Sequence, residues 1–151
     1  MKINLIEFFE ETYQANFDKI AVVDGNRSIT FGDLAQKAKS LAVYIVNKEN
    51  CKNRPVAIYL PKCIETVYSD LAVTYSGNAY MNLDVKTPAV RIGNIISLIQ
   101  PQAVITDSKH IEALKPSCPE NLLIINVDEV PECGDYNIGV LDSIIDADPY
   151  C

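Results

Sequence analysis

Short apolar runs alternate with amphipathic stretches through the middle of this chain, and this rhythm restricts the fold more than any other feature. The runs occupy residues 56–60, 79–83, 103–106 and 122–126. Apolar residues recur at helical spacing between them, most clearly over 64–75. Short buried strands that alternate with helices form parallel sheets covered on both sides. The sequence therefore predicts an α/β fold with a mostly parallel sheet and helices on both faces.

A helix and a short hairpin are expected before this sheet. Apolar residues fall on one helical face over 5–13, and Asp24-Gly25 separates two short extended runs, which is typical of a hairpin turn. Thr30 and Asp33 have the spacing of a helix start, and an apolar stripe follows from Leu34.

Further along, the sequence predicts one more pair of helices and a final apolar element. Thr87 and Pro88 are expected to be the cap and first residue of a helix that carries Ile92. Residues 108–114 predict a short helix, and residues 140–145 a short helix or strand.

The charge balance excludes one large class of partners. The chain of 151 residues has a net charge of −7, and its 13 basic residues are scattered rather than gathered into a patch. Nucleic-acid binders obtain most of their affinity from such patches, so we expect no nucleic-acid partner. No apolar run reaches the roughly 18 residues of a membrane helix, and the N-terminus lacks a secretory signal pattern. These observations predict no membrane association and a cytoplasmic location.

The residue types that commonly carry catalysis lack the spacing that they would need. The five cysteines are far apart, without the paired spacing of a zinc or redox site, and are expected to be reduced thiols. His110 is the single histidine and is expected at the surface rather than as a ligand or base. The six glycines form neither nucleotide fingerprint, and no Gly-Lys-Ser or Gly-Lys-Thr occurs. We therefore expect no catalytic, cofactor-binding or metal-binding residue in the chain.

The stretch 71–84 combines a helix closed by Gly77, a very short turn, and a strand that ends at Asp84. Ligands of open α/β sheets gather beyond such strand ends, which would suit Asp84 for binding. The residues alone favour a simpler interpretation, in which Gly77 stops the helix and Asp84 forms a turn.

Two groups of residues nevertheless form recognisable motifs. The first group is Thr30, Phe31 and Leu34, and the second is Gly77, Ala79, Tyr80, Leu83, Asp84, Pro88 and Arg91. They resemble the first and second core motifs of a known family, the amino-acid adenylation domains of nonribosomal peptide synthetases, which are adenylate-forming (AMP-binding) enzymes. The resemblance covers almost the whole chain in the right order. The chain departs from the family at Asn82, where proline is usual, and at Tyr75-Ser76, where Lys-Ala is usual.

The resemblance implies a fold and a parent activity. Residues 1–151 would form a single truncated domain, the N-terminal portion of an adenylation domain that ends before the phosphate loop. The parent ligase would use ATP and Mg to form an acyl- or aminoacyl-adenylate and pass the acyl group to the thiol of a carrier protein or of CoA. Tyr80 favours the amino-acid-activating members.

The same resemblance implies that the fragment would not catalyse the reaction, because the residues that hold ATP and the acid lie downstream in the family. Its partner would be the remainder of the adenylation domain. We also expect self-association through the face that a cut between strands exposes.

An alternative is a non-catalytic flavodoxin-like or receiver-like binding module, which the same rhythm of strands and helices permits. A receiver would need acidic residues after its first core strand, and a flavodoxin a Ser/Thr-rich loop. The chain has Pro61-Lys62-Cys63 there instead. The sequence also leaves open a third interpretation, in which the chain is a truncated or degenerate gene product with a purely structural role.

Overall fold

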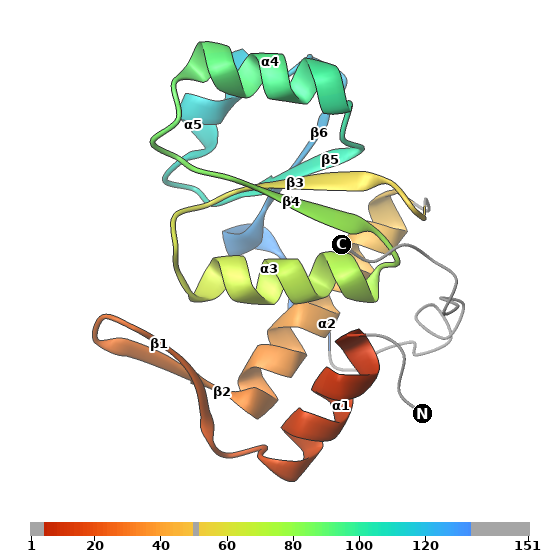
Figure 1. Ribbon diagram of the computed structural model, residues 1–151, viewed down its shortest axis with the longest axis vertical. Helices are drawn as coiled ribbons and strands as arrows, with labels where there is room; N and C mark the ends of the chain where they lie inside the picture. Colours follow the sequence, from red (N-terminus) through yellow and green to blue (C-terminus); the bar gives the residue numbers. More distant parts are fainter. Residues whose placement is uncertain (1–4, 50–51, 134–151) are drawn as a thin grey trace.

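Four parallel strands form the centre of the fold in the computed structural model, which describes residues 5–49 and 52–133 (Figure 1). The strands are β3 (Pro55–Tyr59), β4 (Ala79–Leu83), β5 (Ala103–Thr106) and β6 (Leu123–Asn126), in the sheet order β4-β3-β5-β6. Every pair of neighbours is parallel. The predicted strands and the α/β class are confirmed.

Helices cover both faces of this sheet, as the sequence predicts (Figure 1). The helices are α2 (Phe31–Lys48) and α3 (Ile64–Tyr75) on one face, and α4 (Ala89–Ile99) and the short α5 (Ile111–Leu114) on the other. Alternation along β3 explains the two cores, because Val56 and Ile58 pack with α2 and α3. Ala57 and Tyr59 pack against α4 and α5 instead.

The order in which strands are added to the sheet reverses once, although all four strands are parallel. From β3 the chain passes through α3 to β4 on one side, and it then crosses through α4 to β5 and on to β6 on the other side. A point where the order reverses in this way leaves a crevice between the two strands concerned, here β3 and β5.

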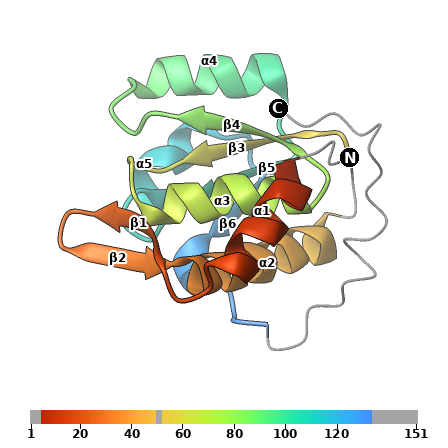
Figure 2. The same cartoon turned by 60° about the horizontal axis from the view of Figure 1, so that its bottom comes forward.

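An N-terminal unit lies beside the α2–α3 face (Figure 2). It comprises α1 (Leu5–Ala15) and the antiparallel hairpin of β1 (Ile20–Asp24) and β2 (Arg27–Thr30). Gly25 adopts a φ of +61° in the hairpin turn, a conformation that glycine accepts without strain. α1 contains no fully buried residue and contacts both α2 and α3. The predicted helix and hairpin are both present.

Thr30 begins α2 as predicted. Its Oγ1 accepts a hydrogen bond from the backbone N–H of Asp33 at 3.1 Å and donates one to Asp33 Oδ2 at 2.9 Å. This reciprocal capping satisfies an N–H that the first turn of a helix would otherwise leave unpaired.

The start of α4 differs from the prediction that Thr87 caps it. Thr87 belongs to the preceding turn, where its backbone N–H donates to the carbonyl of Asp84, and Pro88 occupies the N-cap position. Proline fixes an extended residue there, so α4 begins at Ala89.

Two other predicted elements remain to be compared with the structure. The helix predicted over 108–114 is shorter, because a turn at residues 107–110 precedes α5. The element predicted over 140–145 lies outside the described residues. In the part of the chain that the structure describes, none of the helices is long and apolar enough to cross a membrane.

Candidate functional site

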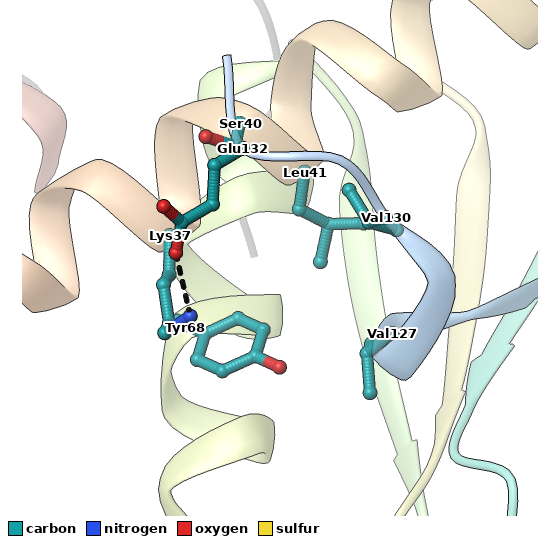
Figure 3. A pocket seen from close by; sticks show the side chains of 7 residues that line it. All are labelled: Lys37, Ser40, Leu41, Tyr68, Val127, Val130 and Glu132. Carbon is teal, nitrogen blue, oxygen red and sulfur yellow. Dashed lines mark hydrogen bonds and ion pairs between the residues drawn. The ribbon is translucent and has the colours of Figure 1, made fainter. Parts of the chain in front are cut away.

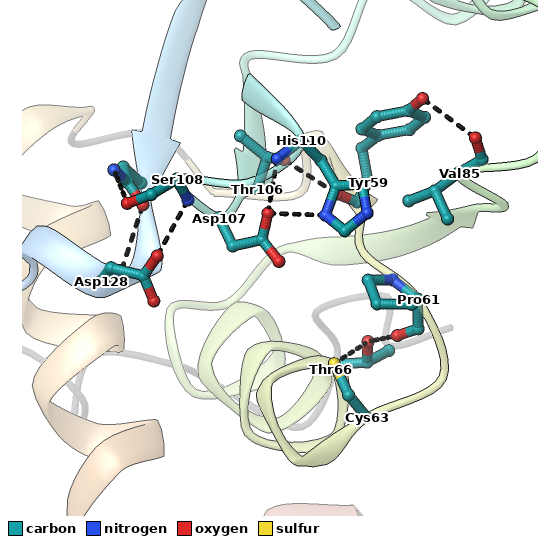
Figure 4. A network of polar contacts seen from close by, with 11 residues as sticks. Tyr59, Pro61, Cys63, Thr66, Val85, Thr106, Asp107, Ser108, His110 and Asp128 are labelled. Atoms are coloured by element: carbon teal, nitrogen blue, oxygen red, sulfur yellow. Dashed lines mark hydrogen bonds and ion pairs between the residues drawn. The ribbon is translucent and has the colours of Figure 1, made fainter. Parts of the chain in front are cut away.

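The carboxyl edge of the sheet is the candidate site, because the ends of all four parallel strands meet there. The reversal between β3 and β5 opens at this edge, and ligands of open α/β sheets bind at such points. The loops that follow these two strands begin at Leu60 and Asp107. Their polar groups form the network in Figure 4.

Tyr59 joins three segments at this crevice. Its backbone carbonyl accepts a hydrogen bond from Thr106 Oγ1 at 2.9 Å, and its hydroxyl donates to the carbonyl of Val85 at 3.2 Å (Figure 4). The ring of His110 lies edge-on to that of Tyr59, with centroids 6.4 Å apart. The ends of β3 and β5 and the loop after β4 are thus held together.

Asp107 orients His110. Asp107 Oδ1 accepts from the backbone N–H of His110 at 2.8 Å and lies 2.6 Å from its Nδ1. Both side chains are partly buried, with 19% of His110 and 17% of Asp107 exposed, so only part of the His110 ring reaches the surface. A carboxylate at Nδ1 favours the tautomer with the proton on that nitrogen. The same contacts also close the turn before α5, which is a structural role.

Cys63, at the start of α3, is not an activated nucleophile. Its Sγ lies 3.6 Å from Thr66 Oγ1, which donates to the carbonyl of Pro61 at 2.6 Å (Figure 4). Burial raises the pKa of the Cys63 thiol. A protonated thiol is a poor nucleophile and metal ligand, so the contacts of this residue serve the loop after β3.

A groove of about 790 Å³ lies beside this edge, and we call it the edge groove. Its walls come from β2, α2, α3 and the segment after β6. The lining residues are Arg27, Ser28, Ile29, Asp33, Gln36, Lys37, Ile64, Glu65, Tyr68, Val127, Asp128, Val130 and Glu132.

Arg27 and Glu65 fix one wall of the edge groove. Arg27 Nη1 and Nη2 bond to the two carboxylate oxygens of Glu65 at 2.8 and 3.0 Å, and Nη2 also bonds to Asp24 at 2.5 Å. The guanidinium lowers the pKa of Glu65 to about 2. This paired fork ties the hairpin to the first turn of α3.

The opposite wall is formed by residues 130–133, which cross α2 and which we call the strap. Lys37 Nζ pairs with Glu132 at 3.3 Å, and the backbone N–H of Cys133 donates to Ser40 Oγ at 3.1 Å. A small cavity of about 30 Å³ lies beneath the strap, between Tyr68 and Val130 (Figure 3).

The described residues do not fit Mg-ATP. Residues 5–49 and 52–133 contain no group of three acidic, histidine or cysteine side chains that could hold a metal ion. The helix that follows the crevice, α3, carries Glu65 in its first turn, and a carboxylate there opposes a phosphate. Gly25 and Gly77 lie in separate turns rather than in one loop.

The structure places the motif residues in three separate regions. Thr30, Phe31 and Leu34 lie where β2 meets α2, and Leu34 is buried in the α2–α3 core. Ala79, Tyr80 and Leu83 belong to β4, with Tyr80 facing the α2–α3 core and Leu83 the α4 core. Pro88 and Arg91 are exposed at the start of α4. They form no common cluster.

Gly77 and Asp84 adopt the roles that the residues alone favour. Gly77 has a φ of +74° directly after α3, and Asp84 Oδ1 accepts from the backbone N–H of Lys86 at 2.9 Å in the turn after β4. Neither contact involves a ligand.

The sequence reasoning overlooked Asn78, which is completely buried between α3 and β4. Its Oδ1 accepts from the backbone N–H of Arg54 at 3.1 Å, and its Nδ2 donates to the carbonyl and hydroxyl of Ser76 at 3.2 and 3.1 Å. Only its position within an apolar stretch next to Gly77 could have drawn attention to it.

A polar cluster also escaped notice on the α1 side. Tyr75 Oη donates to Glu10 Oε1 at 2.5 Å, and Lys39 Nζ pairs with the same carboxylate oxygen at 2.7 Å and with Tyr13 Oη at 3.1 Å. The cluster attaches α1 to α2 and α3. Tyr75, which stands where the family usually has lysine, therefore has a structural contact.

A comparison with protein families decides the assignment that the motifs suggest. The model of the family described as AMP-binding enzyme matches residues 9–142. The chain belongs to this family. The match extends over nearly the whole fold, from the first helix to beyond β6.

The chain is also similar to parts of several much longer proteins. It is 31% identical to N-(5-amino-5-carboxypentanoyl)-L-cysteinyl-D-valine synthase of Penicillium rubens over 126 residues, which are 82% of the chain and 3% of the synthase. It is 34% identical to tyrocidine synthase 1 of Brevibacillus parabrevis over 100 residues, which are 66% of the chain and 9% of that protein. The chain thus spans less than a tenth of these relatives.

Solved structures share the fold. The four-domain nonribosomal peptide synthetase holo-AB3403, bound to AMP and glycine, aligns with a TM-score of 0.80 and 17% identity, covering 91% of this chain and 10% of that one. The luciferase-like enzyme of the Zophobas morio mealworm aligns with a TM-score of 0.75 and 19% identity, covering 89% of this chain and 36% of that one. The chain is therefore the N-terminal part of an adenylate-forming domain like those of peptide synthetases.

Proposed function

We propose that this chain is the opening scaffold of an adenylation domain that uses Mg-ATP to activate an amino acid. The parent enzyme forms an aminoacyl-adenylate and transfers the acyl group to the thiol of a carrier protein. The thiol of CoA is the alternative acceptor. We propose that the protein is cytoplasmic, because the cytoplasm supplies the ATP that this reaction needs. Cell fractionation tests this location.

The observation that carries this proposal is the family match over residues 9–142, which covers nearly all of the described fold. The similarity to synthetases that build peptides supports an amino acid as the acid. Tyr80 lies on β4 within the second core motif and is consistent with that choice.

The 151 residues by themselves do not catalyse adenylation under this proposal. Stabilising the charge that develops during transfer to a phosphate requires backbone N–H groups, a cation and a metal near one point. The pairing of Arg27 and Lys37 with carboxylates is consistent with this proposal. The remainder of the adenylation domain would have to supply that arrangement.

ATP–pyrophosphate exchange tests the proposal in two parts. The 151-residue chain alone, assayed with the twenty amino acids, is expected to give the exchange of a blank. A chimaera in which this chain replaces the matching segment of tyrocidine synthase 1 is expected to retain exchange. The same chimaera carrying Ile58→Asp, which places a charge in the core, is expected to lose both its fold and its activity.

Two results would overturn the proposal. One is exchange by the 151 residues alone. The other is a chimaera that folds, by circular dichroism and gel filtration, and gives no exchange. Loading of a labelled amino acid onto carrier protein or CoA by the active chimaera then distinguishes the two thiol acceptors.

A further inference from the structure

We propose that the edge groove binds a small aliphatic amine that also carries a hydrogen-bond acceptor. This proposal is independent of the proposed adenylation function, since it concerns a groove formed wholly by described residues. Three features support it: the unpaired hydroxyl of a largely buried tyrosine, apolar lining residues and an excess of carboxylates.

The hydroxyl belongs to Tyr68, which is 8% exposed and lines both the edge groove and the small cavity beneath the strap. Its hydroxyl end lies on the side of Val127 in Figure 3. Within residues 5–49 and 52–133, no hydrogen bond reaches that hydroxyl. The hydroxyl can therefore donate to an acceptor that enters the groove in place of solvent.

The hydroxyl remains a donor over the whole physiological range. Burial raises the pKa of Tyr68, and the neighbouring carboxylates of Glu65 and Asp128 raise it further. The protonated phenol can therefore donate to a neutral carbonyl oxygen of a ligand.

Apolar side chains provide space for an aliphatic body. Ile29, Ile64, Val127 and Val130 line the groove on both of its long sides. Its volume of about 790 Å³ falls within the range of about 300–1,000 Å³ that is typical of small-molecule sites. Burial of an aliphatic group against these residues would supply hydrophobic free energy.

The charge of the residues that line the groove favours a ligand with a positively charged group. Glu65 is neutralised by Arg27 and Glu132 by Lys37. The carboxylates of Asp33 and Asp128 accept hydrogen bonds from uncharged donors instead, the hydroxyl of Thr30 and the backbone N–H of Ser108. The groove therefore carries two uncompensated carboxylates, which attract an ammonium group.

Leucinamide matches all three features, since it has an ammonium group, a carbonyl acceptor and an isobutyl side chain. N-acetyl-leucinamide is the matched neutral control. Titration of the ¹⁵N-labelled 151-residue chain is expected to give saturable chemical-shift changes at residues of the edge groove with leucinamide. The neutral analogue is expected to bind at least about fivefold more weakly, because it lacks the charge.

Variants separate the contributions. Tyr68→Phe removes only the hydroxyl and should weaken leucinamide binding about fivefold, and Asp128→Asn should do the same through the charge. Tyr44→Phe, a tyrosine on α2 that does not line the groove, should leave binding unchanged. Thermal melting checks that each variant is folded.

The proposal is overturned if leucinamide gives no saturable shifts at the groove. It is also overturned if the folded Tyr68→Phe protein binds like the parent, or if both ligands bind equally. Shifts confined to residues elsewhere in the chain would contradict it as well.

Discussion

Asn78 fixes a short connection in the fold, where three residues, Ser76, Gly77 and Asn78, join α3 to β4. The backbone turns at Gly77, with a φ of +74°, and Asn78 follows with a completely buried side chain. Its amide bonds to Arg54 before β3 and to Ser76 after α3. One side chain therefore connects the starts of β3 and β4, the two strands on one side of the reversal in the sheet.

Asn78→Ala is expected to destabilise the chain by about 2–3 kcal/mol, because it removes the hydrogen bonds that a completely buried amide makes to Arg54 and Ser76. Urea unfolding followed by circular dichroism measures the change. Asn94→Ala, at an exposed position on α4, is the control and should change the free energy of unfolding by no more than about 0.5 kcal/mol. Equal effects of the two substitutions would show that the amide network is dispensable.

The hairpin and α3 are separate elements that one ion pair connects. Arg27 in β2 lowers the pKa of Glu65 to about 2, far below the value of 4.5 that the group has by itself. A carboxyl whose folded pKa is depressed stabilises the fold above its unfolded pKa. That contribution is lost as the pH falls from about 4.5 towards 2.

Glu65→Gln is therefore expected to lower the urea midpoint at pH 7 and to have much less effect at pH 2.5, where the parent protein has lost most of this contribution to its stability. The matched control is Glu112→Gln, which removes an exposed pair with Lys115 on α5. The control should show little effect at either pH, since exposed pairs contribute little. A pH-independent difference between parent and Glu65→Gln would contradict the proposed role of the charge.

The elements themselves could be predicted from sequence where their causes are local. Strand β3, the hairpin turn at Gly25 and the cap at Thr30 each depend on residues within a few positions. The cap of α4 was predicted at Thr87 and is wrong, because the turn closed by Asp84 takes that residue.

Contacts between distant residues could not be predicted in this way. Glu10 meets Tyr75 across 65 positions of the sequence, and Arg27 meets Glu65 across 38. The edge groove likewise combines residues from 27 to 132, so no local pattern indicates it. Tyr68 looked like one more apolar position on a helix, and only the assembled fold shows that its hydroxyl faces a groove.

At the scale of the whole molecule, the large exposed apolar side chains of residues 5–49 and 52–133 are distributed unevenly. Five of them lie in the N-terminal unit: Leu5, Phe8, Phe17, Ile20 and Val23. The other three of this described set, Val90, Leu98 and Ile99, lie on α4, across the sheet from that unit. Val90 and Leu98 are 78% and 81% exposed and are two helical turns apart on the same side of the helix. Exposed apolar groups of this kind favour association between protein surfaces.

We expect the 151-residue chain to self-associate, with α4 as a contact surface. Light scattering after gel filtration should show an apparent mass that rises with protein concentration. Val90→Lys with Leu98→Lys should lower that mass towards the monomer, because paired chains would have to bury like charges. Gln14→Lys with Asn26→Lys adds the same charge at exposed positions outside α4 and should leave the association unchanged. A parent chain that stays monomeric at every concentration would exclude self-association, and equal effects of the two double variants would mean that net charge, rather than the apolar face of α4, controls it.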